Sequence, residues 1–230
     1  MTRPVAVYLE IGSKRVFSGA LDWPGWCRAA KTEEDALAAL LRYGGRYRLV
    51  AQRAGLDFRP AGDRDGLEVV ERLKGGPGTD FGVPGEAPSI DATELTPAEL
   101  ERQLAILTGC WAAFDEAAAA AVGVKLRTGP RGGGRSLEKI RAHVLEADEA
   151  YLRQLGSRPP KQVGNDVAHT ATLRDAIVAT LAVRARGEAL VTPNNVQRPW
   201  LPRYHVRRAA WHALDHAWEV EDRSRPEVSG

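Results

Sequence analysis

Two histidines near the C-terminus, His212 and His216, have the spacing of a metal-binding pair. Side chains four residues apart on an α-helix lie one turn above each other on the same face, and Glu219 follows on that face about one turn later. Imidazole nitrogens and carboxylate oxygens are typical ligands of divalent transition metals. A further histidine, His143, lies within a second segment with helical periodicity. We therefore predict a divalent-metal site whose ligands are His143, His212 and His216.

The chemistry of such a site follows from its ligands. Three neutral imidazoles leave the charge of a divalent ion intact and leave coordination positions open. The ion then lowers the pKa of a bound water toward about 7, or holds a substrate thiolate as a nucleophile. Glu219 and Asp215 are expected to accept hydrogen bonds from the ring N–H groups. Glu219 can alternatively be an extra ligand, and Asp215 a solvated charge near the helix end.

The same histidines have a simpler interpretation. A histidine on an apolar helix face is more often a hydrogen-bonded core residue than a ligand, and Trp211 and Trp218 flank this pair. A histidine in a second helix, His143, favours the metal site. His169, in a third predicted helix, is a reserve ligand.

Basic side chains precede both histidine-bearing helices. In an up-down-up-down bundle the second and fourth helices begin at the same end, so these side chains are predicted to line one mouth of the site. There they would bind an anionic substrate. The alternative for any single arginine is a solvated basic rim. The side chains are Arg131 and Arg135 before His143, and Arg203, His205, Arg207 and Arg208 before His212.

Composition narrows the class of protein. The 230 residues carry a formal net charge of only +2, which does not favour nucleic acid as a partner. Two cysteines, Cys27 and Cys110, are too few for a disulfide framework and fit a reducing compartment. No apolar stretch approaches the roughly 18 residues of a membrane span, and the N-terminus lacks the apolar core of a signal peptide. We expect a cytoplasmic protein without a membrane partner.

The first third of the chain predicts a small α+β unit. Residues 5–11 and 15–21 are apolar and β-branched around a Gly12–Lys14 turn, which indicates a hairpin. Thr32, followed by acidic residues, begins a helix, and the alternation in 67–73 indicates a third strand. We therefore predict a ββαβ domain over residues 1–75. Residues 76–93 are rich in Gly and Pro and are expected to be a linker without helix or strand.

The remaining residues, 94–230, have the periodicity of four amphipathic helices. Thr96 and Glu99 form a capping box with Pro97 at the first helical position, and Ser136 caps the second helix. The pattern predicts a second, all-α domain: an up-down-up-down four-helix bundle whose metal ligands project inward from the second and fourth helices.

The N-terminal half resembles the HicB-like fold, in which a hairpin leads through a P-G-C-type turn into a T-x-E-E-A-type helix. The resemblance covers about the first 50 residues and implies the fold rather than an antitoxin role. The residues that carry it are Pro24, Gly25, Thr32, Glu33, Glu34, Ala36 and Leu37.

The C-terminal half, over roughly residues 93–225, resembles the DinB-like superfamily, which includes the mycothiol-dependent maleylpyruvate isomerase group. The resemblance implies a divalent metal, often zinc or nickel, on three histidines, with a low-molecular-weight thiol as a possible cosubstrate. The motif residues are His143, Glu146, Ala147, Tyr151, His212 and His216.

Two functions follow from these resemblances. The first is a metal-dependent enzyme, either a thiol-dependent transferase or isomerase or a hydrolase, acting on a small anionic or thiol-linked substrate. The alternative is a non-catalytic interaction protein, in which the HicB-like part binds a partner and the bundle is a homodimer scaffold. The sequence does not decide between them.

Overall fold

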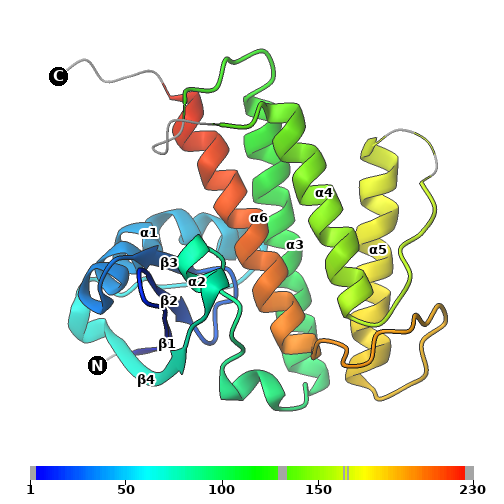
Figure 1. The fold of residues 1–230 in the computed structure, drawn as a ribbon, viewed down its shortest axis with the longest axis horizontal. Coiled ribbons are helices and arrows are strands. Elements are labelled where there is room, and N and C mark those ends of the chain that lie inside the picture. Colours follow the sequence, from blue (N-terminus) through cyan, green and yellow to red (C-terminus); the bar gives the residue numbers. More distant parts are fainter. Residues whose placement is uncertain (1–3, 129–133, 163, 165, 226–230) are drawn as a thin grey trace.

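The computed structural model describes residues 4–128, 134–162, 164 and 166–225. A small sheet with its helix comes first, and four long helices follow (Figure 1). The strands are β1 (Val5–Ile11), β2 (Val16–Ala20), β3 (Cys27–Ala30) and β4 (Leu67–Lys74). The helices are α1 (Glu33–Arg53), α2 (Pro77–Phe81), α3 (Pro97–Ala120), α4 (Leu137–Gln154), α5 (Asp166–Ala185) and α6 (Pro202–Ser224), with 3-10 turns η1 (Arg64–Gly66) and η2 (Ser89–Ala92).

The sheet is mixed, in the order β3-β2-β1-β4. β1 and β2 form the predicted antiparallel hairpin, with Leu9 opposite Ser18, and β4 lies parallel to β1 at one edge. β3 was not predicted, because its four residues directly follow an aromatic turn and are too short to show an alternating pattern. The sheet therefore has one strand more than the ββαβ prediction.

The turn before β3 fills the space between the sheet and α1. Trp26 is fully buried, and its indole N–H donates to the Leu40 carbonyl of α1 (2.9 Å). The Tyr47 hydroxyl donates to the Pro24 carbonyl (2.8 Å), and Phe58 meets the Trp26 ring edge-on at 5.0 Å. The three aromatic side chains belong to one buried apolar cluster.

The helix starts follow the capping signals of the sequence. The Thr32 hydroxyl accepts from the Asp35 N–H at the start of α1, and Thr96 and Glu99 cap α3 reciprocally. α1 continues through Gly44 and Gly45, although glycine costs a helix about 1 kcal/mol relative to alanine. Packing against the sheet compensates for that cost.

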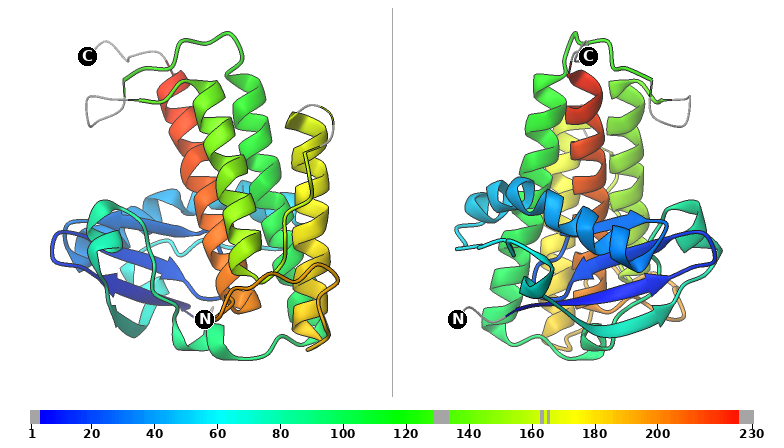
Figure 2. Two further views of the ribbon diagram at one scale, coloured as in Figure 1. Left: turned by 45° about the vertical axis from the view of Figure 1, so that its right-hand side comes forward. Right: turned by 90° about the vertical axis from the view of Figure 1, so that its left-hand side faces the viewer.

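The sheet and the long helices do not form separate layers with separate cores. One buried apolar cluster extends from Val7 of β1 to Val220 of α6. α3 packs against α1, and Gly25, in the turn before β3, lies against Ala210 and Leu214 of α6. Figure 2 shows the sheet and α1 set against one side of the long helices. The prediction of a second, all-α domain is therefore wrong, because the whole arrangement is α+β.

The direction of the helices also differs from the up-down-up-down prediction. The Trp200 N–H, just before α6, donates to the Gln154 carbonyl at the end of α4 (2.7 Å). Arg184, near the end of α5, donates to the Trp200 carbonyl (3.3 Å). The ends of α4 and α5 thus both lie at the start of α6, so these two helices run parallel to each other and antiparallel to α6 (Figure 1). The order is up-down-down-up.

The connection between α4 and α5 is long enough to allow this arrangement. A connection of about ten residues between α4 and α5 can span roughly 35 Å, which is more than the about 30 Å of a 20-residue helix. The connection can therefore return along the helices before α5 begins. As a consequence, α4 and α6 begin at opposite ends.

The segment 76–93 is not the featureless linker that was expected, because it contains α2 and η2. Its first part is fixed by Glu10 of β1, which is fully buried. The Glu10 carboxylate accepts from the Thr79 hydroxyl and from the N–H groups of Gly85 (3.0 Å) and Glu86 (3.1 Å). A carboxylate that accepts three hydrogen bonds can be buried at low cost. None of the helices in the described ranges combines the length and apolar composition required to cross a membrane.

Candidate metal centre

The three predicted ligands converge between α4 and α6. One ligand nitrogen from each of His143, His212 and His216 lies within 4.8 Å of the other two. The Nε2 atoms of His143 and His212 are 3.2 Å apart, and the three ring centroids are separated by 4.6 to 5.0 Å. The three imidazoles therefore face a common point.

Local packing explains this convergence. Ile140 and Val144 of α4 are buried, and His143 lies beside them at the half-buried margin of that apolar stripe. α6 is buried along most of its length and packs closely on α3. His212 and His216, only 6% and 8% exposed, are thus held in an element that has little freedom to move.

The environment favours the neutral forms of His143 and His212. Burial is the main cause that lowers the pKa of His212 well below its ordinary value, and the neighbouring His216 and His143 add to it. Burial also lowers the pKa of His143, with further contributions from His216 and Arg135. A neutral imidazole presents a lone pair, which is the form that binds a metal.

Glu219 fixes the orientation of His216. Its Oε2 lies 2.8 Å from Nδ1 of His216, so that nitrogen carries the proton and Nε2 is left to face the other imidazoles. The other Glu219 oxygen accepts from Arg223 (2.7 Å), which also donates to the carbonyls of Arg127 and Arg135. The hydrogen bond from His216 is the main cause that lowers the pKa of Glu219. Glu219 therefore acts on the imidazole rather than as a fourth ligand.

The donor set fits a tetrahedral divalent ion. Zn–N bonds of about 2.0–2.1 Å place ligand nitrogens about 3.4 Å apart, close to the 3.2 Å between His143 and His212. The same contact is also compatible with a hydrogen bond between two neutral imidazoles, one of which donates. Nδ1 of His212 is buried and has no hydrogen-bond partner among the residues described. A metal on its Nε2 would require that proton to remain on Nδ1, as it does in neutral imidazole ligands.

The other predicted residues of the fourth helix are placed elsewhere. Asp215 pairs with Arg28 of β3 (3.1 Å) and does not contact the imidazoles. His205 lies on the histidine face of α6 but is fully buried. Burial lowers the pKa of His205 to about 4, with the backbone of Tyr151 acting in the opposite direction.

Arg203 and Arg207 lie on the opposite face of α6. They are nine and five residues before His212, which at 100° per residue places them on the far side of the helix. Arg207 pairs with Asp91 of η2 (2.7 Å), and Arg203 pairs with Glu99 of α3 (2.7 Å). Arg207 thus joins α6 to η2, and Arg203 joins it to α3. Neither arginine lines a mouth at the histidines.

Of the remaining predicted arginines, Arg131 lies outside the described residues. Arg135 is exposed, and its carbonyl accepts from Arg223. Arg208 lies one turn before His212, and its guanidinium is 4.7 Å from the Trp211 ring centre and 5.6 Å from that of Tyr151. Of the arginines predicted at the start of α6, Arg208 is the one that lies beside the imidazoles.

Arg223 was missed by the sequence analysis. It is 7% exposed and holds Glu219 together with two backbone carbonyls. The signal was present, because Glu219 and Arg223 are four residues apart with the acid first, which is the favourable order on a helix.

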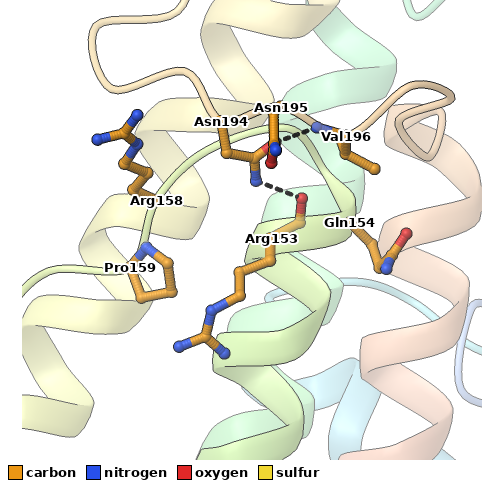
Figure 3. A pocket seen from close by; sticks show the side chains of 7 residues that line it. All are labelled: Arg153, Gln154, Arg158, Pro159, Asn194, Asn195 and Val196. Atoms are coloured by element: carbon orange, nitrogen blue, oxygen red, sulfur yellow. Dashed lines mark hydrogen bonds between the residues drawn. The ribbon is translucent and has the colours of Figure 1, made fainter.

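Two surface pockets lie away from the histidines. The first, of about 320 Å³, is at the end of α4, where the Asn194 amide donates to the Arg153 carbonyl (Figure 3). The second, also about 320 Å³, lies between Trp23, Arg102 and Arg203. Neither pocket is lined by a histidine.

The two cysteine thiols are buried and unpaired. Burial raises the pKa of Cys27 to about 12 and also raises that of Cys110, so neither is a thiolate at neutral pH.

Comparison of the chain with known protein families, with curated proteins and with solved structures finds no match.

Proposed function

We propose that this chain is a DinB-like protein that binds one divalent metal ion, zinc or nickel, through His143, His212 and His216. The observation that carries the proposal is the convergence of three imidazoles from two helices, with one ligand nitrogen of each lying within 4.8 Å of the others. Glu219 supports it, because a carboxylate on the second nitrogen of a ligand histidine is the usual arrangement around a metal.

We further propose that the site is catalytic. A divalent ion held by three neutral ligands keeps its charge and supplies Lewis acidity to a small substrate. Arg208 and Tyr151 flank His212 and can orient an anionic group. The activity would be that of a thiol-dependent transferase or isomerase, or of a hydrolase, acting on a small anionic or thiol-linked substrate.

Metal binding tests this proposal directly. Protein purified without a histidine tag should contain close to one zinc or nickel ion per chain by elemental analysis. His143→Ala and His212→Ala should each lose the ion. His169→Gln is a matched control, because His169 is a buried histidine that pairs with Glu149 of α4 outside the cluster (3.0 Å). A wild-type protein that binds neither ion after their addition would exclude this function.

One observation favours the alternative of a non-catalytic interaction protein. β4 is an edge strand of the sheet, and its Val70 side chain is 49% exposed. An exposed strand edge can accept a strand from a partner. In that case a protein partner, or a second copy of the chain, would remain bound during purification, and loss of the three histidines would not release it.

A further inference from the structure

The walls of the candidate metal centre differ in charge on its two sides. Toward the C-terminal end of α6 lies Arg223, whose guanidinium is saturated by Glu219 and two backbone carbonyls. Toward the N-terminal end lie Arg208, Tyr151 and Trp211. The charge of Arg223 is thus balanced by Glu219, whereas the charge of Arg208 on the second side is not balanced by a carboxylate among the described residues.

Arg208 lies close to the histidines by helix geometry. It precedes His212 by four residues, which places their Cβ atoms about 6 Å apart on the same side of α6. Tyr151, eight residues after His143 on the antiparallel α4, lies at the same level, with its ring centre 5.7 Å from that of His212. A ligand bound at the histidines and extending toward the start of α6 would meet these two side chains.

Arg208 differs from its neighbours in lacking a carboxylate. Arg28, Arg203, Arg207 and Arg223 all pair with a Glu or Asp. Arg208 has no carboxylate partner in the described part of the chain. One of its Nη1 hydrogens goes to the Pro84 carbonyl, and its plane is supported by the Trp211 and Tyr151 rings. The Arg208 guanidinium is therefore held in place before a ligand binds, and its charge and remaining N–H donors can interact with that ligand.

The Tyr151 hydroxyl can add a second donor. A phenol hydroxyl with an ordinary pKa of about 10 carries its proton at neutral pH and can donate it to an acceptor. A carboxylate between the two side chains would accept from both.

We propose that Arg208 and Tyr151 bind a carboxylate of the substrate, whose other end reaches the ion held by the three histidines. The substrate class is accordingly a small organic acid with a metal-binding group a few bonds from the carboxylate. This inference rests on the proposed function. Arg135 is the rival cation, but it is exposed, and within the described part of the chain neither a carboxylate nor an aromatic ring holds its guanidinium.

The cobalt-loaded protein provides the test, because Co²⁺ absorbs light and thiolate binding adds a charge-transfer band. The probes are 3-mercaptopropionate and its uncharged amide, which share the thiol and the size and differ in charge. Wild type should bind the acid about tenfold more tightly, relative to the amide, than Arg208→Gln does, since a charge-assisted hydrogen bond contributes about that factor. Affinity for the amide should be the same in both proteins.

Two further variants make the assignment specific. Tyr151→Phe should lose a smaller part of the preference, and Arg135→Gln should keep it. Equal ratios in wild type and Arg208→Gln, loss of the preference in Arg135→Gln instead, or no charge-transfer band with either probe would each overturn the inference. If Co²⁺ itself does not bind, the proposed function fails as well. If Co²⁺ binds and the preference is absent, the metal centre stands and this inference alone fails.

Discussion

Arg207 and Asp91 form a bidentate ion pair in the interior, with Nη2–Oδ1 and Nε–Oδ2 distances of 2.7 and 2.8 Å. The side chains are 7% and 0% exposed. Arg207 also donates to the carbonyls of Ala20, the last residue of β2, and of Leu21. One guanidinium thus joins α6, η2 and the sheet.

Removal of Asp91 should therefore be costly. Asp91→Ala leaves a buried cation without its partner, and we expect the free energy of unfolding to fall by about 3–5 kcal/mol. Urea denaturation followed by circular dichroism measures the loss. The control is Asp57→Ala, whose pair with Arg59 is 77% and 78% exposed and should change stability by less than about 0.5 kcal/mol. Similar losses in the two variants would contradict a structural role for the buried pair.

Glu219 should matter for metal affinity more than for folding. Glu219→Gln weakens the hold on Nδ1 of His216, and we expect metal affinity to drop about 10- to 100-fold, as for other carboxylates behind a ligand histidine. Competition with a chromophoric chelator measures the affinity. Asp215→Asn is the matched control, since Asp215 pairs with Arg28, and its affinity should stay within about twofold. The assignment fails if the two variants lose affinity to the same extent.

Stability should depend on pH through Asp148. Burial raises the pKa of this α4 side chain to about 7, and the nearby Arg174 acts in the opposite direction. The folded protein therefore holds a proton that the unfolded chain releases near pH 4. The corresponding stabilisation is complete below pH 4 and is lost as the pH rises to about 7, on the order of 4 kcal/mol in all.

Asp148→Asn removes this titration. Its unfolding free energy, measured in urea at several pH values between 5 and 8, should decline less with rising pH than that of wild type. The difference between the two proteins should therefore favour the variant at pH 8. Parallel pH profiles would show that the Asp148 pKa is not raised.

Gly25 should be sensitive to the smallest side chain. Its φ is +92°, and a Cβ there would lie 2.9 Å from Leu214 Cδ1 and 3.2 Å from Ala210 Cβ. Gly25→Ala is expected to destabilise the protein by about 1–3 kcal/mol. Gly45→Ala, in α1 with no atom near the new methyl group, should instead stabilise it by about 0.5–1 kcal/mol. Thermal unfolding of both variants distinguishes the contact from a general effect of alanine.

Local signals predicted most of the elements. The hairpin, the Thr32 and Thr96 caps and the four long helices are where the sequence indicates them, because each depends on residues within a few positions of one another. His212 and His216 could be placed together for the same reason, since they are one helical turn apart, and His143 could be added because its helix is expected to pack against theirs.

The arrangement of the elements was less accessible. The direction of α5 depends on the path of the chain between residues 154 and 166, whose length permits either direction. The merging of the sheet with the long helices depends on contacts such as Gly25 with Leu214, which are far apart in the sequence. The placement of Arg203 and Arg207 could have been foreseen from helix geometry. At 100° per residue, positions nine and five residues before His212 lie on the opposite side of the helix from it.

The buried pair of Arg207 and Asp91 has a consequence on the far side of α6. A one-residue slip of this helix would turn it by about 100°, and in one of the two directions it would bring Val206 in place of Arg207 to the Asp91 carboxylate. The pair therefore fixes the rotation of α6 about its own axis. The direction in which His212 and His216 point therefore depends on Asp91, which lies in the 3-10 turn η2 and outside the histidine cluster.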